Sequence, residues 1–233
     1  MNRTLCILCA LSITGCNWMP GRPKAEDKWQ PPTAVSDFTT LYNQNCLACH
    51  GVGGVVSGSL GMDNPTYLAV VPRETLDTVI DQGTPGTAMP AFSIAAGGTL
   101  TDDQIEILMN GILAKKPTHP ADKLPPYAAA LGNPAAGAAV FASSCASCHG
   151  KSGAGGEKAG SVIDPAYLSL VTDQYLRTIV IAGRPDLGCP DFASRIPGRA
   201  MTTEEIADVT AWLVANRKNE FGQPLAPAAP TQP

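Results

Sequence analysis

The sequence has 233 residues, which is enough for two small domains and too few for many more. Charged residues make up 15% of it, the net charge is −4, and no run of Lys or Arg occurs, so a nucleic-acid-binding protein is excluded. Aromatic residues make up only 6%, so side chains alone would build thin hydrophobic cores. A buried cofactor would help such small domains to fold.

The N-terminus is typical of a bacterial lipoprotein signal peptide. Arg3 precedes an apolar run over residues 5–13, which is too short to span a bilayer but suits the core of a signal peptide. The run ends in Ile-Thr-Gly-Cys, which resembles the lipobox, where cleavage precedes the cysteine and the thiol carries diacylglycerol. We therefore predict a signal peptide over 1–15 and lipidation of Cys16. The alternative is an ordinary signal peptide with an incidental cysteine.

A Pro-rich and charged segment follows, and we expect residues 16–34 to tether the folded part to the periplasmic side of a bacterial membrane. The chain then repeats four motifs at offsets of 99 to 101 residues. These are CLACHG and CASCHG, NPTYL and DPAYL, GTPGTAMPAF and GRPDLGCPDF, and LTDDQIEIL and MTTEEIADV. The repeat predicts two tandem domains, 35–116 and 135–217. A linker over 117–134 and a disordered tail over 218–233 complete the predicted organisation.

Each repeat is predicted to be helical. Helices are expected over 37–45 and 135–144, before the CxxCH motifs, and over 72–81 and 172–182, where apolar residues recur at helical spacing. A third pair begins after Thr101 or Asp102 and after Thr202, which forms a capping box with Glu205. Because no segment alternates with a period of two for long, the predicted fold class is all-α.

Two copies of Cys-Xaa-Xaa-Cys-His carry the clearest chemistry. In c-type haem attachment the two thiols add across the vinyl groups of the porphyrin, and the adjacent histidine ligates the iron. The six residues are Cys46, Cys49 and His50 in the first copy and Cys145, Cys148 and His149 in the second. A zinc site would need further ligands, and the remaining histidine, His119, is interpreted as a solvated residue of the linker. The motifs predict two covalently bound haems c.

With these motifs the sequence resembles the class I cytochrome c family twice over, across residues 35–116 and 135–217. The resemblance implies that the first and last helices of each domain cross. In the second copy Gly137, Phe141 and Trp212 match the family's residues at the crossing. In the first copy the sizes are exchanged, with Phe38 in place of the glycine and Gly111 in place of the tryptophan. Such an exchange keeps the packed volume; the alternative is an alignment that is wrong by one helical turn.

The resemblance also implies the remaining residues of the haem sites. Met89, in a loop and followed by proline, matches the distal iron ligand of the family. Pro65 and Pro165 match the proline whose carbonyl accepts a hydrogen bond from the proximal histidine, which would orient each ring.

Cys189 occupies the position of Met89 in the second copy, and three interpretations are open. The preferred one makes Cys189 a thiolate ligand of the second haem, as in some sulfur-oxidising dihaem cytochromes. The second gives that place to Met201, which by the offsets falls on the apolar Leu100. The third leaves Cys189 in a disulfide or as a free thiol, although no intramolecular partner remains. Because a thiolate stabilises ferric iron, we expect the second haem to have the lower potential.

Two functions follow from the resemblance. The favoured one is a membrane-anchored dihaem electron carrier, or a complex subunit, in a respiratory or photosynthetic chain. It would act between a quinol-oxidising complex and a terminal acceptor such as an oxidase, with redox proteins as partners. The alternative is a dihaem dehydrogenase of sulfur compounds, of the thiosulfate type, acting at a His/Cys-ligated haem. The enzyme interpretation is disfavoured because Cys189 is its only support, and we assign no catalytic residue.

Overall fold

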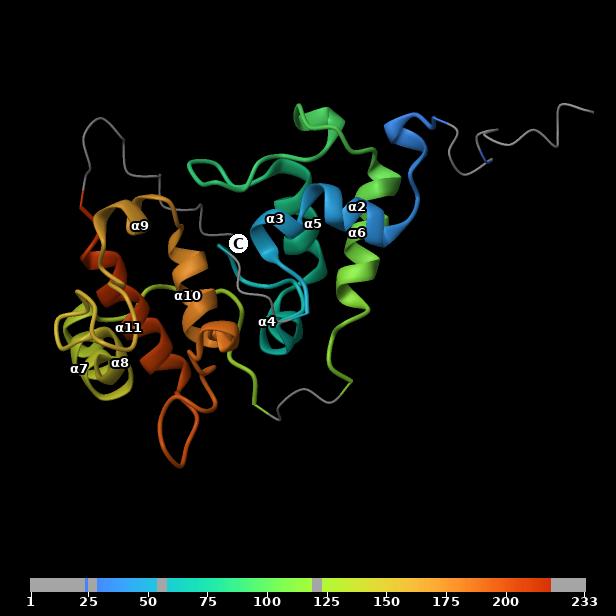
Figure 1. The fold of residues 1–233 in the computed structure, drawn as a ribbon. Coiled ribbons are helices and arrows are strands. Elements are labelled where there is room, and N and C mark those ends of the chain that lie inside the picture. Colours follow the sequence, from blue (N-terminus) through green and yellow to red (C-terminus); the bar gives the residue numbers. More distant parts are fainter. Residues whose placement is uncertain (1–23, 25–28, 54–57, 119–122, 219–233) are drawn as a thin grey trace, which may run out of the picture. The chain divides into compact units, whose positions relative to one another are not determined.

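The computed structural model describes Lys24 and residues 29–53, 58–118 and 123–218 (Figure 1). In this part of the chain every regular element is a helix, and β pairing is limited to isolated bridges such as Arg184 with Cys189. The all-α prediction is therefore confirmed. The predicted signal peptide, Cys16, His119 and nearly all of the predicted tail lie outside the described residues. None of the described helices is long and apolar enough to cross a membrane.

The N-terminal unit, Met1–Val35, contributes the short 3-10 helix η3 (Pro32–Ala34) to the described part. The rest of the chain repeats one series of elements. In the first repeat these are α2 (Phe38–Asn45), α3 (Leu47–His50), α4 (Pro65–Val70), α5 (Arg73–Gln82), η4 (Ile94–Ala96) and α6 (Asp102–Leu113). In the second they are α7 (Pro134–Ser144), α8 (Ala146–His149), α9 (Pro165–Ser169), α10 (Asp173–Ala182), η5 (Pro185–Leu187) and α11 (Thr203–Ala215).

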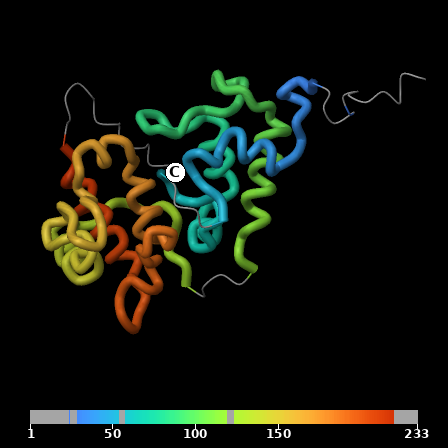
Figure 2. Tube along the Cα trace, viewed as in Figure 1, coloured from blue at the N-terminus to red at the C-terminus, as the bar shows by residue number. Residues whose placement is uncertain are grey.

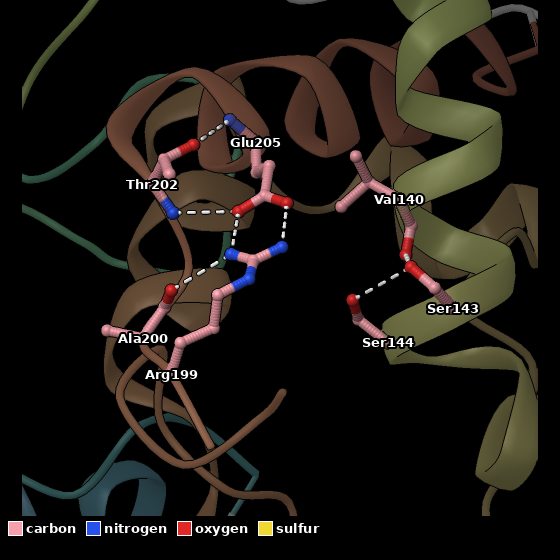
Figure 3. A network of polar contacts seen from close by, with 7 residues as sticks. All are labelled: Val140, Ser143, Ser144, Arg199, Ala200, Thr202 and Glu205. Carbon is pink, nitrogen blue, oxygen red and sulfur yellow. Dashed lines mark hydrogen bonds and ion pairs between the residues drawn. The ribbon is translucent and has the colours of Figure 1, made fainter. Parts of the chain in front are cut away.

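The last helix of each repeat begins with a capping box. In α11 the Thr202 hydroxyl accepts a hydrogen bond from Glu205 N at 3.1 Å, and the Glu205 carboxylate accepts one from Thr202 N at 2.8 Å (Figure 3). Two free N–H groups of the first turn are thereby satisfied. Arg199 donates to both oxygens of the same carboxylate, at 2.6 and 2.7 Å. In α6 the box is formed by Thr101 with Gln104, so Thr101 is the residue that precedes the helix.

The short helices α4 and α9 were not predicted. Each begins with a side-chain cap followed by proline at the first helical turn. Asn64 accepts from Tyr67 N, and Asp164 accepts from Tyr167 N, while Pro65 and Pro165 follow. Proline suits this position because its missing N–H would have no helical partner. The motifs NPTYL and DPAYL therefore specify helix starts.

The first and last helices of each repeat pack closely, α2 with α6 and α7 with α11 (Figure 1). A Cβ atom on Gly111 would lie 2.1 Å from a ring atom of Phe38. A Cβ atom on Gly137 would lie 2.0 Å from the Asp208 carbonyl oxygen and 2.9 Å from Trp212 Cβ. In the first pair the Phe38 ring lies over Gly111, and in the second Gly137 lets the backbone of α11 approach while the Trp212 ring stacks on Phe141. The predicted exchange of sizes is confirmed.

The hydrophobic core of each repeat lies between these helices. In the first repeat the fully buried residues include Leu41, Leu68, Leu108 and Ile112. In the second they include Leu168, Ile181, Ile206 and Val209. Met201 belongs to the core of the second repeat and is 4% exposed, as Leu100 is 5% exposed in the first. Met201 is thus a packing residue of this core.

Candidate haem sites

Each CxxCH motif forms one short helical turn after the first helix of its repeat. Cys46 precedes α3, and its carbonyl accepts from His50 N at 2.9 Å. Cys145 precedes α8, and its carbonyl accepts from His149 N at 3.1 Å. The thiols of both motifs are free of disulfide bonds. The turn therefore groups two thiols and one imidazole, as attachment of a porphyrin requires.

Both histidine rings are oriented by backbone carbonyls. His50 Nδ1 lies 2.8 Å from Leu60 O, and His149 Nδ1 lies 2.8 Å from Gly160 O. Because a carbonyl only accepts, each Nδ1 must carry the hydrogen, which leaves the lone pair of a neutral ring on Nε2. A histidine that ligates a metal through Nε2 has this arrangement.

The predicted partners of the histidines, the carbonyls of Pro65 and Pro165, were wrong. Both prolines stand in the first turn of a helix, α4 or α9. A carbonyl at this position points along the helix axis toward the N–H four residues later, and so away from a side chain beside the helix. Leu60 and Gly160 supply the carbonyls instead, from the loops that follow the CxxCH turns.

Burial shapes the ionisation of the first site. It lowers the pKa of His50 and raises the pKa of the Cys46 thiol to about 11. Both shifts favour the uncharged form of the side chain. A neutral imidazole is the form that can ligate a metal.

The loops that carry Met89 and Cys189 have the same backbone frame. Thr84 N donates to Met89 O at 2.9 Å, and Arg184 N donates to Cys189 O at the same distance. Gly183, with φ of +66°, opens the second loop, where a Cβ would lie 2.6 Å from Cys189 O. Figure 2 traces this second loop in orange before the last helix. The alignment of Met89 with Cys189 therefore holds in three dimensions.

Cys189 is half-buried beside His149. The two side chains are hydrogen-bonded, and Arg195 Nη1 lies 3.6 Å from Cys189 Sγ. Burial alone would raise the pKa of this thiol, but the hydrogen bond with His149 and the charge of Arg195 outweigh it and lower the pKa to about 7. The same hydrogen bond raises the pKa of His149. The structure thus brings the sulfur of the second loop to the histidine of the second CxxCH motif.

The donor groups of both sites fit an iron porphyrin. Each site offers two free thiols and an imidazole whose Nε2 carries the lone pair. The second also offers Cys189 next to the same imidazole. Arg195 was missed by sequence reasoning. The sequence did contain a sign of it: the corresponding segment of the first copy, residues 93–99, has no charged residue.

Two helical domains, each with CxxCH on a short turn between crossing helices, define a protein built from tandem cytochrome c domains. Residues 33–110 and 132–213, together more than half of the chain, match the family model described as "Cytochrome C oxidase, cbb3-type, subunit III". The chain belongs to this family.

Three relatives share parts of this sequence. The chain is 31% identical over 138 residues to the cbb3-type cytochrome c oxidase subunit CcoP of Azospirillum sp. (strain B510), covering 54% of the chain and 43% of that protein. It is 30% identical over 139 residues to CcoP of Cereibacter sphaeroides, covering 55% and 43%. It is 34% identical over 76 residues to cytochrome c6 of Leptolyngbya boryana, covering 32% and 85%. The matched part spans less than half the length of the two CcoP relatives.

Proposed function

We propose that the chain is an electron-transfer protein that carries two covalently bound haems c and delivers electrons to a cbb3-type terminal oxidase, free or as its subunit. The observation that carries the proposal is the repeated CxxCH turn, in which Nδ1 of His50 and of His149 is held by a backbone carbonyl. The similarity of the chain to CcoP subunits supports the choice of a cbb3-type oxidase as the electron acceptor. When bound, each haem supplies a one-electron redox couple.

Four side chains would hold the iron atoms of the two haems. His50 and His149 would each hold an iron through Nε2, because a backbone carbonyl occupies Nδ1 of each ring. At His149 this bond would replace the hydrogen bond with Cys189. Met89 would hold the iron of the first haem and Cys189 that of the second, supported by the shared frame of their loops and by the contact of Cys189 with His149. Met201 is not assigned as a ligand, since it is buried in the core of the second domain.

A lipid anchor at Cys16 is part of the proposal and rests on the Ile-Thr-Gly-Cys sequence after an apolar run. The mature protein would then begin at Cys16 on the periplasmic side of the membrane. Mass spectrometry of the native N-terminus tests this assignment. An acylated cysteine at the first position supports it, and cleavage at another residue contradicts it.

Haem content and electron delivery test the function. Pyridine haemochrome analysis should give two haems c per chain that resist extraction by acidic acetone, and Cys145→Ser should remove one of them. The reduced protein should then be reoxidised in air by a cbb3-type oxidase core that lacks its own haem c subunits. A protein that instead reduces ferricyanide with thiosulfate, and is not reoxidised by the oxidase, would be a sulfur-compound dehydrogenase.

The ligand assignment at the second haem has its own test. The oxidised protein should show a low-spin ferric EPR signal with a narrow g-spread beside a signal of the His/Met type. Cys189→Met should replace the narrow signal and raise the potential of the second haem, because a neutral thioether stabilises ferric iron less than a thiolate does. Met201→Leu is the control and should leave the spectrum intact. The opposite pattern would assign Met201 as the ligand.

A further inference from the structure

We infer that Arg195 is a positioning residue for Cys189: it holds the distal loop by its backbone, donates a hydrogen bond to the sulfur, and thereby raises the potential of the second haem. The inference rests on the proposed ligation by Cys189.

The contacts of Arg195 converge on the distal loop. Nη1 lies 3.6 Å from Cys189 Sγ, while Nη2 donates to Pro190 O at 2.7 Å and to Val180 O at 3.3 Å. Pro190 follows the cysteine, and Val180 belongs to α10. One planar guanidinium therefore ties the cysteine loop to the helix that precedes it, with its donors in fixed relative directions.

The charge of Arg195 is directed at sulfur. Three other arginines of this domain each pair with a carboxylate: Arg184 with Asp186, Arg199 with Glu205 and Arg217 with Asp173. Within the described residues Arg195 has no such ion pair, and its side chain hydrogen-bonds to Cys189 and also to Cys145 of the CxxCH turn. The cation is thus held between the distal sulfur and the attachment motif.

Arg195 also retains a free donor inside the protein. Its Nε is buried and finds no hydrogen-bond partner among the described residues. A buried donor without an acceptor lowers the stability of the folded state. A guanidinium kept at this cost, next to residues that would hold a haem, indicates that its position serves the site as well as the packing of the loop.

The repeat provides an internal comparison. The first copy has Met89 at the ligand position and no charged residue in the segment that follows it, residues 93–99. The second copy has Cys189 and Arg195. A thioether carries no charge to balance, whereas a thiolate does. The positively charged arginine therefore occurs only in the copy whose loop sulfur can carry a negative charge.

The effect on the redox couple has a definite sign. A hydrogen bond to the sulfur withdraws electron density from it, so the sulfur donates less to iron and the ferric state loses stabilisation. A positive charge near the iron acts in the same direction. Arg195 should therefore raise the potential of the second haem above the value that an unsupported thiolate would give.

The test compares Arg195→Gln with Arg199→Gln in the full-length holoprotein. Arg199 is the matched control because it belongs to the same loop but is exposed and bonds Glu205. Redox titration should show that Arg195→Gln shifts the reduction equilibrium of the second haem at least tenfold toward ferric, which is about 59 mV for a one-electron couple. The first haem is the internal reference and should not change, and the g-spread of the second EPR signal should change. Arg199→Gln should leave both haems unaltered.

The outcomes separate this inference from the ligand assignment. If Cys189→Met changes the second EPR signal but Arg195→Gln leaves both potential and g values unchanged, only the role of Arg195 is wrong. If Cys189→Met leaves the signal unchanged, the ligation itself is wrong. If the Arg195→Gln protein does not incorporate haem, Arg195→Lys is the deciding variant. Lysine keeps the charge but not the forked contacts, so the potential of the second haem should still fall, by less than is expected for Arg195→Gln. An unchanged potential in that variant would overturn the inference.

Discussion

The destabilisation caused by Gly111→Ala should be relieved when the facing aromatic side chain is also truncated, whereas that caused by Gly137→Ala should not. The reason is that the two new methyl groups would meet different atoms. The Cβ of Gly111→Ala would lie 2.1 Å from Cδ2 of Phe38, a side chain that can be removed. The Cβ of Gly137→Ala would lie 2.0 Å from the backbone oxygen of Asp208, which no substitution removes. Normal contacts between such atoms are about 3.5 Å, so each helix pair would have to separate by more than about 1 Å.

The magnitudes follow from overpacking and helix propensity. Overpacking costs about 1–3 kcal/mol, while Gly→Ala inside a helix gains about 1 kcal/mol. We expect Gly111→Ala to destabilise the first domain by about 1 kcal/mol, and Gly137→Ala to destabilise the second by about 2 kcal/mol, because the backbone it meets can move less. In a Phe38→Ala background, Gly111→Ala should become neutral or stabilising. In a Trp212→Ala background, Gly137→Ala should remain destabilising.

Urea unfolding of the full-length protein gives the overall free energy of unfolding, and hydrogen exchange with mass spectrometry assigns it to α6 or to α7 and α11. Gly58→Ala is the control, because its Cβ would meet no atom within 4 Å. A coupling between Phe38 and Gly111 below about 0.5 kcal/mol in the double-mutant cycle would refute the packing argument. Rescue of Gly137→Ala by Trp212→Ala would refute it as well.

Two further predictions concern the last helix of the second domain. The hydrogen bonds from Arg199 lower the pKa of Glu205 from 4.5 to about 2, so the stability this carboxylate contributes is complete above pH 4.5 and is lost as the pH falls toward 2; Glu205→Gln should flatten that part of the stability profile measured by circular dichroism. Asp208→Ala should lower the free energy of unfolding in urea by about 1–3 kcal/mol, because the buried carboxylate accepts a hydrogen bond from Asn133 N at 2.6 Å. An equal loss on substituting the exposed Asp102 by alanine would contradict this role.

Local signals were sufficient to predict the main helices, and the resemblance to class I cytochromes c implied the crossings. Apolar spacing located the helices over 72–81 and 172–182 to within one residue of α5 and α10. The repeat then carried the family's crossing residues from the second copy to Phe38 and Gly111 of the first, which are far apart in the sequence and in contact in the structure. Capping chemistry then located the start of the last helix at Thr202.

Contacts made across loops could not be predicted in this way. The carbonyl that holds His50 comes from Leu60, and its position depends on the path of an irregular loop that carries no periodic pattern. The motif NPTYL was assigned to the histidine on the basis of resemblance, although Asn64 followed by Pro65 is in physical terms a helix start. Arg195 was missed because the charge difference between the two copies marks the residue but does not show what it contacts.

The exchanged sizes at the two crossings also determine which helices can pair during folding. Tandem copies of one fold are prone to exchange equivalent segments with each other. If α2 paired with α11, Phe38 would stand where Gly137 packs against the Asp208 backbone and Trp212 Cβ. If α7 paired with α6, two glycines would face each other and leave a void. Both mispaired forms are penalised, one by overlap and one by an unfilled gap. Each first helix therefore packs well only against the last helix of its own domain, which favours correct pairing in the duplicated chain.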